Sequence, residues 1–161
     1  MLNLAPEHHS YDMDSIKLSA CFYRLINTNL LVGGKPDKRD ILTLKEHGIE
    51  RIINCLSPAE QDWDESSYVT GLGLKYQAFC VDKQSGINLT NAGKLKTILA
   101  ACVQERVFLH CATGNRIGAL IALHECRVRG KNIQEAISEG ELWGLKNKKL
   151  VENALLEGED K

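Results

Sequence analysis

The chain has 161 residues, of which 43% are apolar and 25% are charged, which is typical of a folded domain and excludes a disordered chain. This length leaves no room for two full domains. The 20 basic and 21 acidic residues give a net charge of -1, which argues against a broad basic surface for nucleic acid or an acidic membrane.

Apolar periodicity and turn residues predict strands that alternate with helices along the chain. Residues 1–22 lack a sustained pattern and are expected to form an N-terminal arm ahead of one domain over residues 23–161. Segment 58–73 is expected to be a loop or a short helix. Strands are expected at 29–32, 51–56, 74–81 and 107–110, and helices at 38–47, 90–102, 115–129, 133–141 and 146–156. This alternation favours an α/β fold with a mostly parallel central sheet covered by helices on both faces.

Several of the predicted helices have end signals in the sequence. Asp37 is a suitable N-cap for the helix at 38–47 and Gly48 lies where it should end, while Thr90 is a suitable cap for the helix at 90–102. The helix at 115–129 is almost wholly apolar in its first two turns and is followed by Gly130. Its beginning is therefore expected to lie in the centre of the core.

The cysteines and the chain start indicate a soluble, reduced protein. Six cysteines are spread at uneven spacings without a Cys-x-x-Cys pair, so a structural metal is not expected. The longest apolar stretch, at 117–123, is far shorter than the ~18 residues that a membrane span needs. The first twenty residues lack the basic start and apolar block of a secretory signal. We therefore expect a cytoplasmic protein, or one whose leader has already been removed.

One stretch combines a reactive residue type with an anion-binding backbone. Cys111 follows the predicted strand at 107–110, a short loop with Gly114 comes next, and Arg116 lies where the following helix begins. Backbone N–H groups in such a loop converge on one point, to which the helix N-terminus adds about half a positive charge. The same field favours the thiolate form of Cys111. Arg116 adds a permanently charged fork that holds two oxygens of a tetrahedral oxyanion.

His110, Cys111, Gly114 and Arg116 together resemble the signature of the cysteine-dependent protein phosphatases of dual-specificity type. The chain is most similar to a bacterial branch of that protein tyrosine phosphatase superfamily, and the resemblance covers roughly residues 23–150. It is carried by the segments 33–36, 48–56, 114–120 and 136–145. It implies the three-layer phosphatase fold and the hydrolysis of phosphomonoesters, such as protein phosphotyrosine or a small metabolite, through a phosphocysteine. The phosphate-binding residues would be Ala112, Thr113, Gly114, Asn115 and Arg116.

The resemblance also implies a proton donor, an aspartate on a mobile loop after the preceding strand. Asp82 follows the predicted strand at 74–81 and lies in a polar, glycine-containing segment, so it is the candidate acid. Glu60, Asp62 and Asp64 are rivals for this role. His110 is expected to support the nucleophile by hydrogen bonding without transferring protons.

Two positions depart from the family pattern. Four residues separate Cys111 from Arg116, where the family has five, and this shortens the loop by about 3.8 Å of chain. A loop of this length also resembles rhodanese-type sulfurtransferases, so sulfur transfer through a Cys111 persulfide is the alternative function. Ile117 stands where the family has a serine or threonine whose hydroxyl helps the cysteine leave, and Thr113 is the candidate substitute.

Three functions therefore remain open from the sequence: a cysteine phosphatase, a sulfurtransferase, and an anion-binding module without catalysis. The expected partner is a phosphorylated substrate or inorganic phosphate. No nucleic acid, membrane, metal or cofactor is expected, and the sequence indicates no particular oligomeric state.

Overall fold

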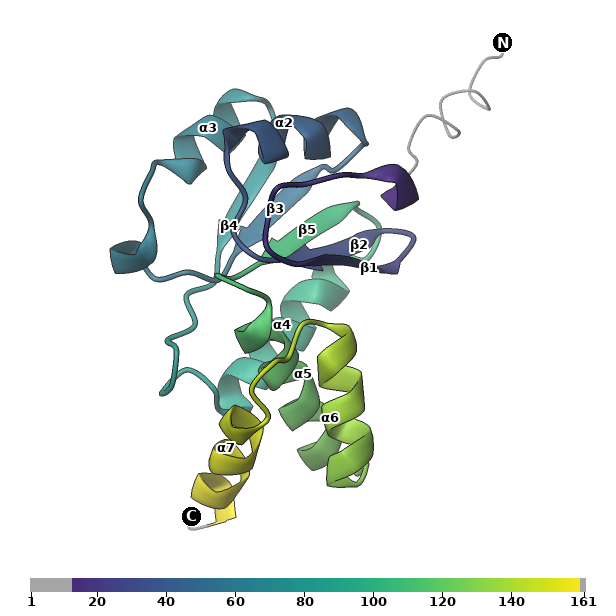
Figure 1. Ribbon diagram of the computed structural model, residues 1–161, viewed down its shortest axis with the longest axis vertical. Helices are drawn as coiled ribbons and strands as arrows, with labels where there is room; N and C mark the ends of the chain where they lie inside the picture. The colour runs from purple at the N-terminus through teal and green to yellow at the C-terminus, as the bar shows by residue number, and fades with distance from the viewer. Residues whose placement is uncertain (1–12, 160–161) are drawn as a thin grey trace.

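The fold is built around one mixed sheet. The structure is a computed structural model that describes residues 13–159. The sheet has five strands in the order β1-β2-β5-β3-β4 (Figure 1). All neighbouring pairs are parallel except β1 and β2, which are antiparallel at one edge. The strands are β1 (Tyr23–Asn27), β2 (Leu30–Gly33), β3 (Arg51–Asn54), β4 (Lys75–Ala78) and β5 (Val107–His110). The predicted α/β fold with a mostly parallel central sheet is confirmed.

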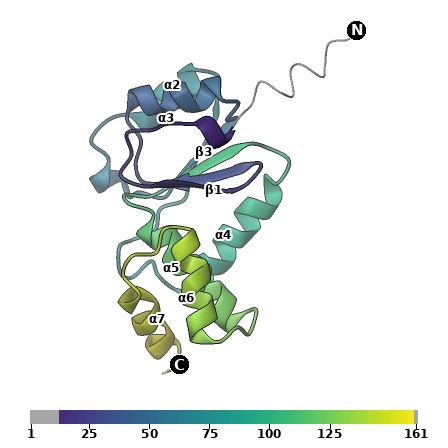
Figure 2. The same cartoon turned by 45° about the vertical axis from the view of Figure 1, so that its right-hand side comes forward.

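Helices cover both faces of the sheet, so that the molecule has three layers. Figures 1 and 2 show α2 and α3 on one face and α4, α5, α6 and α7 on the other. Side chains alternate between the two faces along each strand. Ile52 and Phe108 belong to the core under α2 and α3, while Ile53 and Leu109 belong to the core under α4 and α5. The helices are α2 (Lys38–Glu46), α3 (Glu65–Gly71), α4 (Leu89–Ala101), α5 (Asn115–Arg127), α6 (Ile133–Leu142) and α7 (Lys149–Glu159), and the short 3-10 turns are η1 (Met13–Ser15) and η2 (Pro58–Glu60).

The helix ends follow local hydrogen bonding. Asp37 caps α2, as the sequence predicts, and the structure adds a capping box with Asp40. The cap of α4 differs from the prediction, because Asn88 and not Thr90 accepts the hydrogen bond from the Asn91 N–H. Asn88 also donates to the Ser85 carbonyl oxygen at 2.9 Å, and this second contact fixes the helix start two residues earlier. The first two turns of α5 are buried, as expected.

The antiparallel edge strand β1 was not predicted from the sequence. It pairs with β2 from Tyr23 opposite Gly33 to Asn27 opposite Leu30. Just before it, Met13 and Ile16 are buried in the core under α2 and α3. Residues 1–12 of the predicted arm lie outside the described residues, and the domain boundary at residue 22 stays a prediction. Within residues 13–159, no helix has both the length and the apolar character that crossing a bilayer requires.

Candidate functional site

The candidate site lies where the central strand β5 ends and α5 begins. Cys111 follows β5 directly, and Gly114 is the N-cap residue of α5. Gly114 has a φ of 92°, which L side chains rarely adopt, and a Cβ there would lie 2.7 Å from the Phe22 ring. The loop between Cys111 and Arg116 therefore requires glycine at this position.

The loop carbonyl groups are bound from outside the loop. The Ala112 oxygen accepts a hydrogen bond from the Lys35 N–H at 3.1 Å. The Thr113 oxygen accepts one from the Lys146 ammonium at 2.9 Å. The N–H and C=O groups of a peptide point in opposite directions. These two contacts therefore hold the Thr113 N–H and the Gly114 N–H on the inner side of the loop. Within residues 13–159, the Ala112 and Thr113 N–H groups donate to no other residue. The loop therefore offers free donors to an anion.

The Cys111 sulfur lies beneath this loop. The Gly114 N–H donates to Sγ at 3.1 Å, a contact that stabilises negative charge on sulfur. Cys111 is only 1% exposed and belongs to the core under α4 and α5.

Arg116 is held by one carboxylate and one carbonyl. Its Nη1 donates to Glu60 Oε1 and to the Val81 oxygen, both at 2.9 Å, and its Nη2 donates to Glu60 Oε2. This pairing raises the pKa of Arg116 and lowers that of Glu60 to about 2. A guanidinium has five N–H donors, of which these contacts use three. Nε–H and the second Nη2–H make no other bond within the described residues, and they form the fork that binds two oxygens of an anion.

His110 forms a fully buried pair with Glu65 of α3. Its Nε2 lies 2.8 Å from Glu65 Oε2, and its Nδ1 lies 3.1 Å from the Cys111 oxygen. Both ring nitrogens of His110 therefore have an oxygen partner inside the core. The contact at Nδ1 links the imidazole to the carbonyl group of Cys111, and the supporting role of His110 stays a prediction.

Asp82 is close to the site along the chain, but its carboxylate faces its own loop. Oδ2 accepts hydrogen bonds from the Gln84 and Ser85 N–H groups and from the Ser85 hydroxyl at 2.9 to 3.2 Å. These bonds, above all that of the Ser85 hydroxyl, lower the pKa of Asp82. The preceding residue, Val81, is tied to Arg116 through its carbonyl oxygen. The structure therefore brings the Asp82 backbone, and not its side chain, next to the guanidinium.

The rival carboxylates have other partners. Glu60 binds Arg116, Asp62 lies 3.3 Å from the Lys35 ammonium, and Asp64 caps α3 at Ser67. Of the four candidate acids, only Glu60 therefore places its carboxylate on a predicted site residue.

The remaining predicted phosphate-binding side chains serve the surrounding structure. Asn115 Oδ1 accepts hydrogen bonds from the Lys146 N–H at 2.7 Å and the Asn147 N–H at 3.0 Å, so it fixes the segment between α6 and α7 against the loop. Lys146 also lies over the Phe22 ring, 4.5 Å from its centroid. Ile117 is fully buried. The residues at 112–115 can therefore contribute backbone groups to an anion, while Arg116 contributes a side chain.

Glu65 and Lys146 were not singled out as site residues from the sequence. Glu65 lies 45 residues before its partner His110, and Lys146 lies 33 residues after Thr113. The sequence shows only that Glu65 is a charged residue, and it does not indicate which residue its carboxylate contacts.

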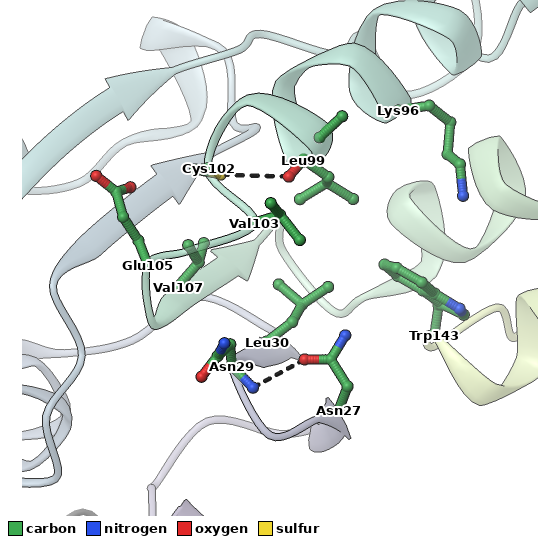
Figure 3. A pocket seen from close by; sticks show the side chains of 11 residues that line it. Asn27, Asn29, Leu30, Lys96, Leu99, Cys102, Val103, Glu105, Val107 and Trp143 are labelled. Carbon is green, nitrogen blue, oxygen red and sulfur yellow. Dashed lines mark hydrogen bonds between the residues drawn. The ribbon is translucent and has the colours of Figure 1, made fainter. Parts of the chain in front are cut away.

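A separate cavity of about 300 Å³ lies at the opposite edge of the sheet (Figure 3). Leu30 and Val107, at the amino ends of β2 and β5, line it together with Leu99, Trp143 and Lys96. Cys111 follows the carboxyl end of β5, so this cavity is not part of the candidate site. Among residues 13–159, no three His, Cys, Asp or Glu side chains gather where they could hold a metal ion.

Comparisons with known proteins find similarity only at the level of structure. No family model matches the sequence, and no curated protein matches it. A candidate phosphatase (DUF442) from Shewanella putrefaciens has a TM-score of 0.64 at 21% identity, covering 86% of this chain and 91% of that one. Tk-PTP in its active form has a TM-score of 0.67 at 14% identity, with 86% and 97% covered. TpbA of P. aeruginosa, solved in complex with pTyr, has a TM-score of 0.55 at 14% identity, with 86% and 88% covered.

These likenesses establish the fold of the chain, which is the three-layer α/β fold of phosphatases. In particular, it is the fold of the protein tyrosine phosphatase-like proteins, to which the neighbours PTPMT1 and a candidate phosphatase from Neisseria meningitidis also point. The fold that the sequence resemblance implies is therefore confirmed.

Proposed function

We propose that the protein is a cysteine-dependent phosphatase that hydrolyses phosphomonoesters of the protein phosphotyrosine or small-metabolite class. The observation that carries this proposal is the unused fork of Arg116 beside a loop whose Ala112 and Thr113 N–H groups have no partner among the described residues, above the sulfur of Cys111. A dianionic phosphoryl group matches these donors in charge and geometry.

The reaction has two steps. The Cys111 thiolate attacks phosphorus, the bond to the leaving oxygen breaks, and a proton goes to that oxygen. Water then attacks the phosphocysteine, which releases inorganic phosphate and regenerates the thiolate. Arg116 and the loop N–H groups stabilise the charge that develops on the equatorial oxygens in both steps.

Asp82 is the proposed proton donor and, in the second step, the base that activates water. A side-chain rotation that breaks its bonds to Ser85 and Gln84 is required first. The backbone position needs no comparable movement, because Val81 is bound to Arg116. The lowered pKa of Asp82 suits the base role at neutral pH and favours the acid role at lower pH.

The test is hydrolysis of p-nitrophenyl phosphate by the wild type and by Cys111→Ser, Arg116→Lys and Asp82→Ala. Cys111→Ser should abolish turnover, and Asp82→Ala should lower kcat by about 10²-fold or more. Ser66→Ala, on the exposed side of α3, is a matched control that should leave kcat unchanged. The proposal is wrong if the wild type releases no phosphate, or if Cys111→Ser retains turnover.

A thiosulfate-to-cyanide assay on the same variants tests the sulfurtransferase alternative. The solved structures that resemble the chain are phosphatases, and they do not favour sulfur transfer. Sulfur transfer by the wild type that survives Asp82→Ala, without phosphate release, would make this alternative the correct function.

We further propose a cytoplasmic location. All six cysteines are free in the structure, and free thiols persist in a reducing compartment.

A further inference from the structure

The cavity at the amino end of β5 has mostly apolar walls. Leu30 and Val107 lie at the amino ends of β2 and β5, Leu99 and Val103 lie at and just after the end of α4, and Trp143 directly follows α6 (Figure 3). Its volume of about 300 Å³ equals that of about ten water molecules in the liquid. This size and this lining are typical of a site for a small molecule.

Hydrogen bonds hold the walls of the cavity in place. The Val107 N–H donates to the Asn29 oxygen at 2.8 Å, which fixes the beginning of β5 against β2. The Trp143 N–H donates to the Gly140 oxygen at 3.0 Å, and its indole N–H donates to Glu139 Oε2 at 3.1 Å. Because the polar atom of the indole already has a partner, the ring is available for apolar contacts. A ligand therefore meets walls that are already formed, which lowers the cost of binding.

One positive charge at the cavity is not neutralised. Lys96 and Glu105 are the two charged residues that line it. The Glu105 carboxylate pairs with Arg51 and then with Lys75, and these contacts lower its pKa to about 2. Within residues 13–159, the Lys96 ammonium forms no hydrogen bond or ion pair. The charge at the cavity therefore favours an anionic group on the ligand.

Two side-chain donors are available to such a group. Glu125 of α5 does not occupy the Lys96 ammonium, because it pairs with Lys131 at 2.7 Å. Asn27 Oδ1 accepts a hydrogen bond from the Asn29 N–H at 2.8 Å, and the Asn27 amide nitrogen donates to no described residue. Figure 3 shows the ends of the Lys96 and Asn27 side chains directed toward the cavity. A carboxylate accepts hydrogen bonds from both kinds of donor.

We propose that this cavity binds a small monocarboxylate with an apolar body, of about ten non-hydrogen atoms in all. The apolar body packs against Leu99, Val103 and Trp143. The carboxylate accepts hydrogen bonds from Lys96 and Asn27. Phenylacetate and octanoate have this size and chemistry, and they serve as the probes. The inference goes beyond the proposed function, because the nucleophile follows the opposite end of β5.

The first test follows the two indole N–H signals of the full chain, labelled with nitrogen-15, by nuclear magnetic resonance. Trp63 is the other tryptophan, and it contacts Tyr68 at the core under α2 and α3, so it is an internal control. Phenylacetate and octanoate should shift the Trp143 signal to saturation at millimolar concentrations or below and leave the Trp63 signal in place. Trp63→Phe assigns the signals. An unmoved Trp143 signal, or equal shifts of both signals, would overturn the inference.

The second test asks whether the site selects a negative charge. Phenylethanol and phenylethylamine keep the aromatic ring of phenylacetate but lack its carboxylate. Both should bind at least about tenfold more weakly, since a hydrogen bond to a charged group is lost. If either compound shifts the Trp143 signal with the same affinity as phenylacetate, the proposed class of ligand is wrong.

The third test changes the cavity itself. Lys96→Gln should raise the Kd for phenylacetate about tenfold, whereas Lys94→Gln, on an exposed position of the same helix, should not change it. Val103→Asp adds a like charge and should abolish binding, while Val128→Asp, away from the cavity, should not. Both valines are exposed, at 63% and 58%, and thermal melting checks that the variants are folded.

Equal affinities of Lys96→Gln and Lys94→Gln would contradict the inference. Binding is measured without a phosphorylated substrate, so its outcome is distinguishable from that of the proposed function. A chain that binds phenylacetate in this way but releases no phosphate from p-nitrophenyl phosphate would sink the proposed function and leave the carboxylate site standing.

Discussion

Glu60 holds Arg116 through both carboxylate oxygens, from a 3-10 turn that lies 56 residues earlier in the chain. The Val81 oxygen takes one further donor, and the donors that remain are Nε–H and one Nη2–H. The carboxylate thus orients the guanidinium and leaves its outer edge for an anion. The Arg116 side chain is only 6% exposed, so water offers few contacts to replace this partner.

Glu60→Gln should therefore impair catalysis more than a neighbouring change on the same loop. Glutamine keeps one acceptor but loses the charge and the second acceptor, so Arg116 is held less firmly. We expect kcat/KM for p-nitrophenyl phosphate to fall by up to about 10²-fold, the effect of a misplaced catalytic group. Asp62→Asn, which affects only an exposed pair with Lys35, is the control and should have little effect. Equal activities of the two variants would refute the orienting role.

Acid should destabilise the fold through two carboxylates. The pKa of Glu60 falls from 4.5 to about 2 because of Arg116, and that of Glu105 falls to about 2 because of Arg51 and then Lys75. Both groups are harder to protonate when folded, so their contribution to stability is complete above pH 4.5 and is lost as the pH falls through about 2.

Urea denaturation at several pH values measures this loss. Glu60→Gln and Glu105→Gln should each flatten the decrease in unfolding free energy between pH 4.5 and 2. Only Glu60→Gln should also lower phosphatase activity, because Glu105 lies near the amino end of β5, away from Cys111. If the unfolding free energy of both variants falls with pH as steeply as that of the wild type, these carboxylates are not the cause of the acid destabilisation.

Local signals in the sequence predicted the parts of the fold that depend on neighbouring residues. The N-cap at Asp37 lies directly before the helix that it begins, and the strand, loop and helix around Cys111 form one continuous stretch of sequence. β1 escaped prediction because an edge strand such as Tyr23–Asn27 is only half buried and shows weak alternation. The cap at Asn88 escaped because Thr90 offered an equally good side chain, and the contact with Ser85 that decides between them depends on the loop.

The site partners depend on which strands and helices become neighbours in space. Cys111 and Arg116 could be chosen from the sequence, since they share one loop. Glu60 was named only as a rival for the acid, and Glu65 was not assigned to the site, because nothing local indicates that a carboxylate will meet an arginine or a histidine many residues away. The orientation of the Asp82 side chain depends on its own turn with Ser85, which periodicity does not reveal.

Removing the Glu65 carboxylate should destabilise the fold through His110. Glu65→Ala leaves the Nε2 atom of a fully buried imidazole without a partner, which costs about 1–3 kcal/mol of unfolding free energy. Glu65→Gln retains a hydrogen-bonding group of similar shape and should cost less. Urea denaturation at neutral pH measures both values. If Glu65→Ala unfolds at the wild-type urea concentration, the pair contributes nothing to stability.

The close contact of α5 with α6 should make Gly118 intolerant of even one added methyl group. A Cβ at Gly118 would lie 2.3 Å from the Leu145 nitrogen and 2.5 Å from the Gly140 oxygen, both backbone atoms that cannot rotate away. Gly118→Ala should therefore destabilise the chain by about 1–3 kcal/mol. It should also lower activity, because Leu145 precedes Lys146, whose N–H group binds Asn115 at the start of α5. Gly93→Ala is the matched control: apart from its chain neighbours and the backbone of its own helix, no described atom lies within 4 Å of the new Cβ, and alanine inside α4 should stabilise the helix by about 0.5–1 kcal/mol. Thermal or urea unfolding should shift in opposite directions for the two variants, and a shift in the same direction would show that α5 and α6 can separate at little cost.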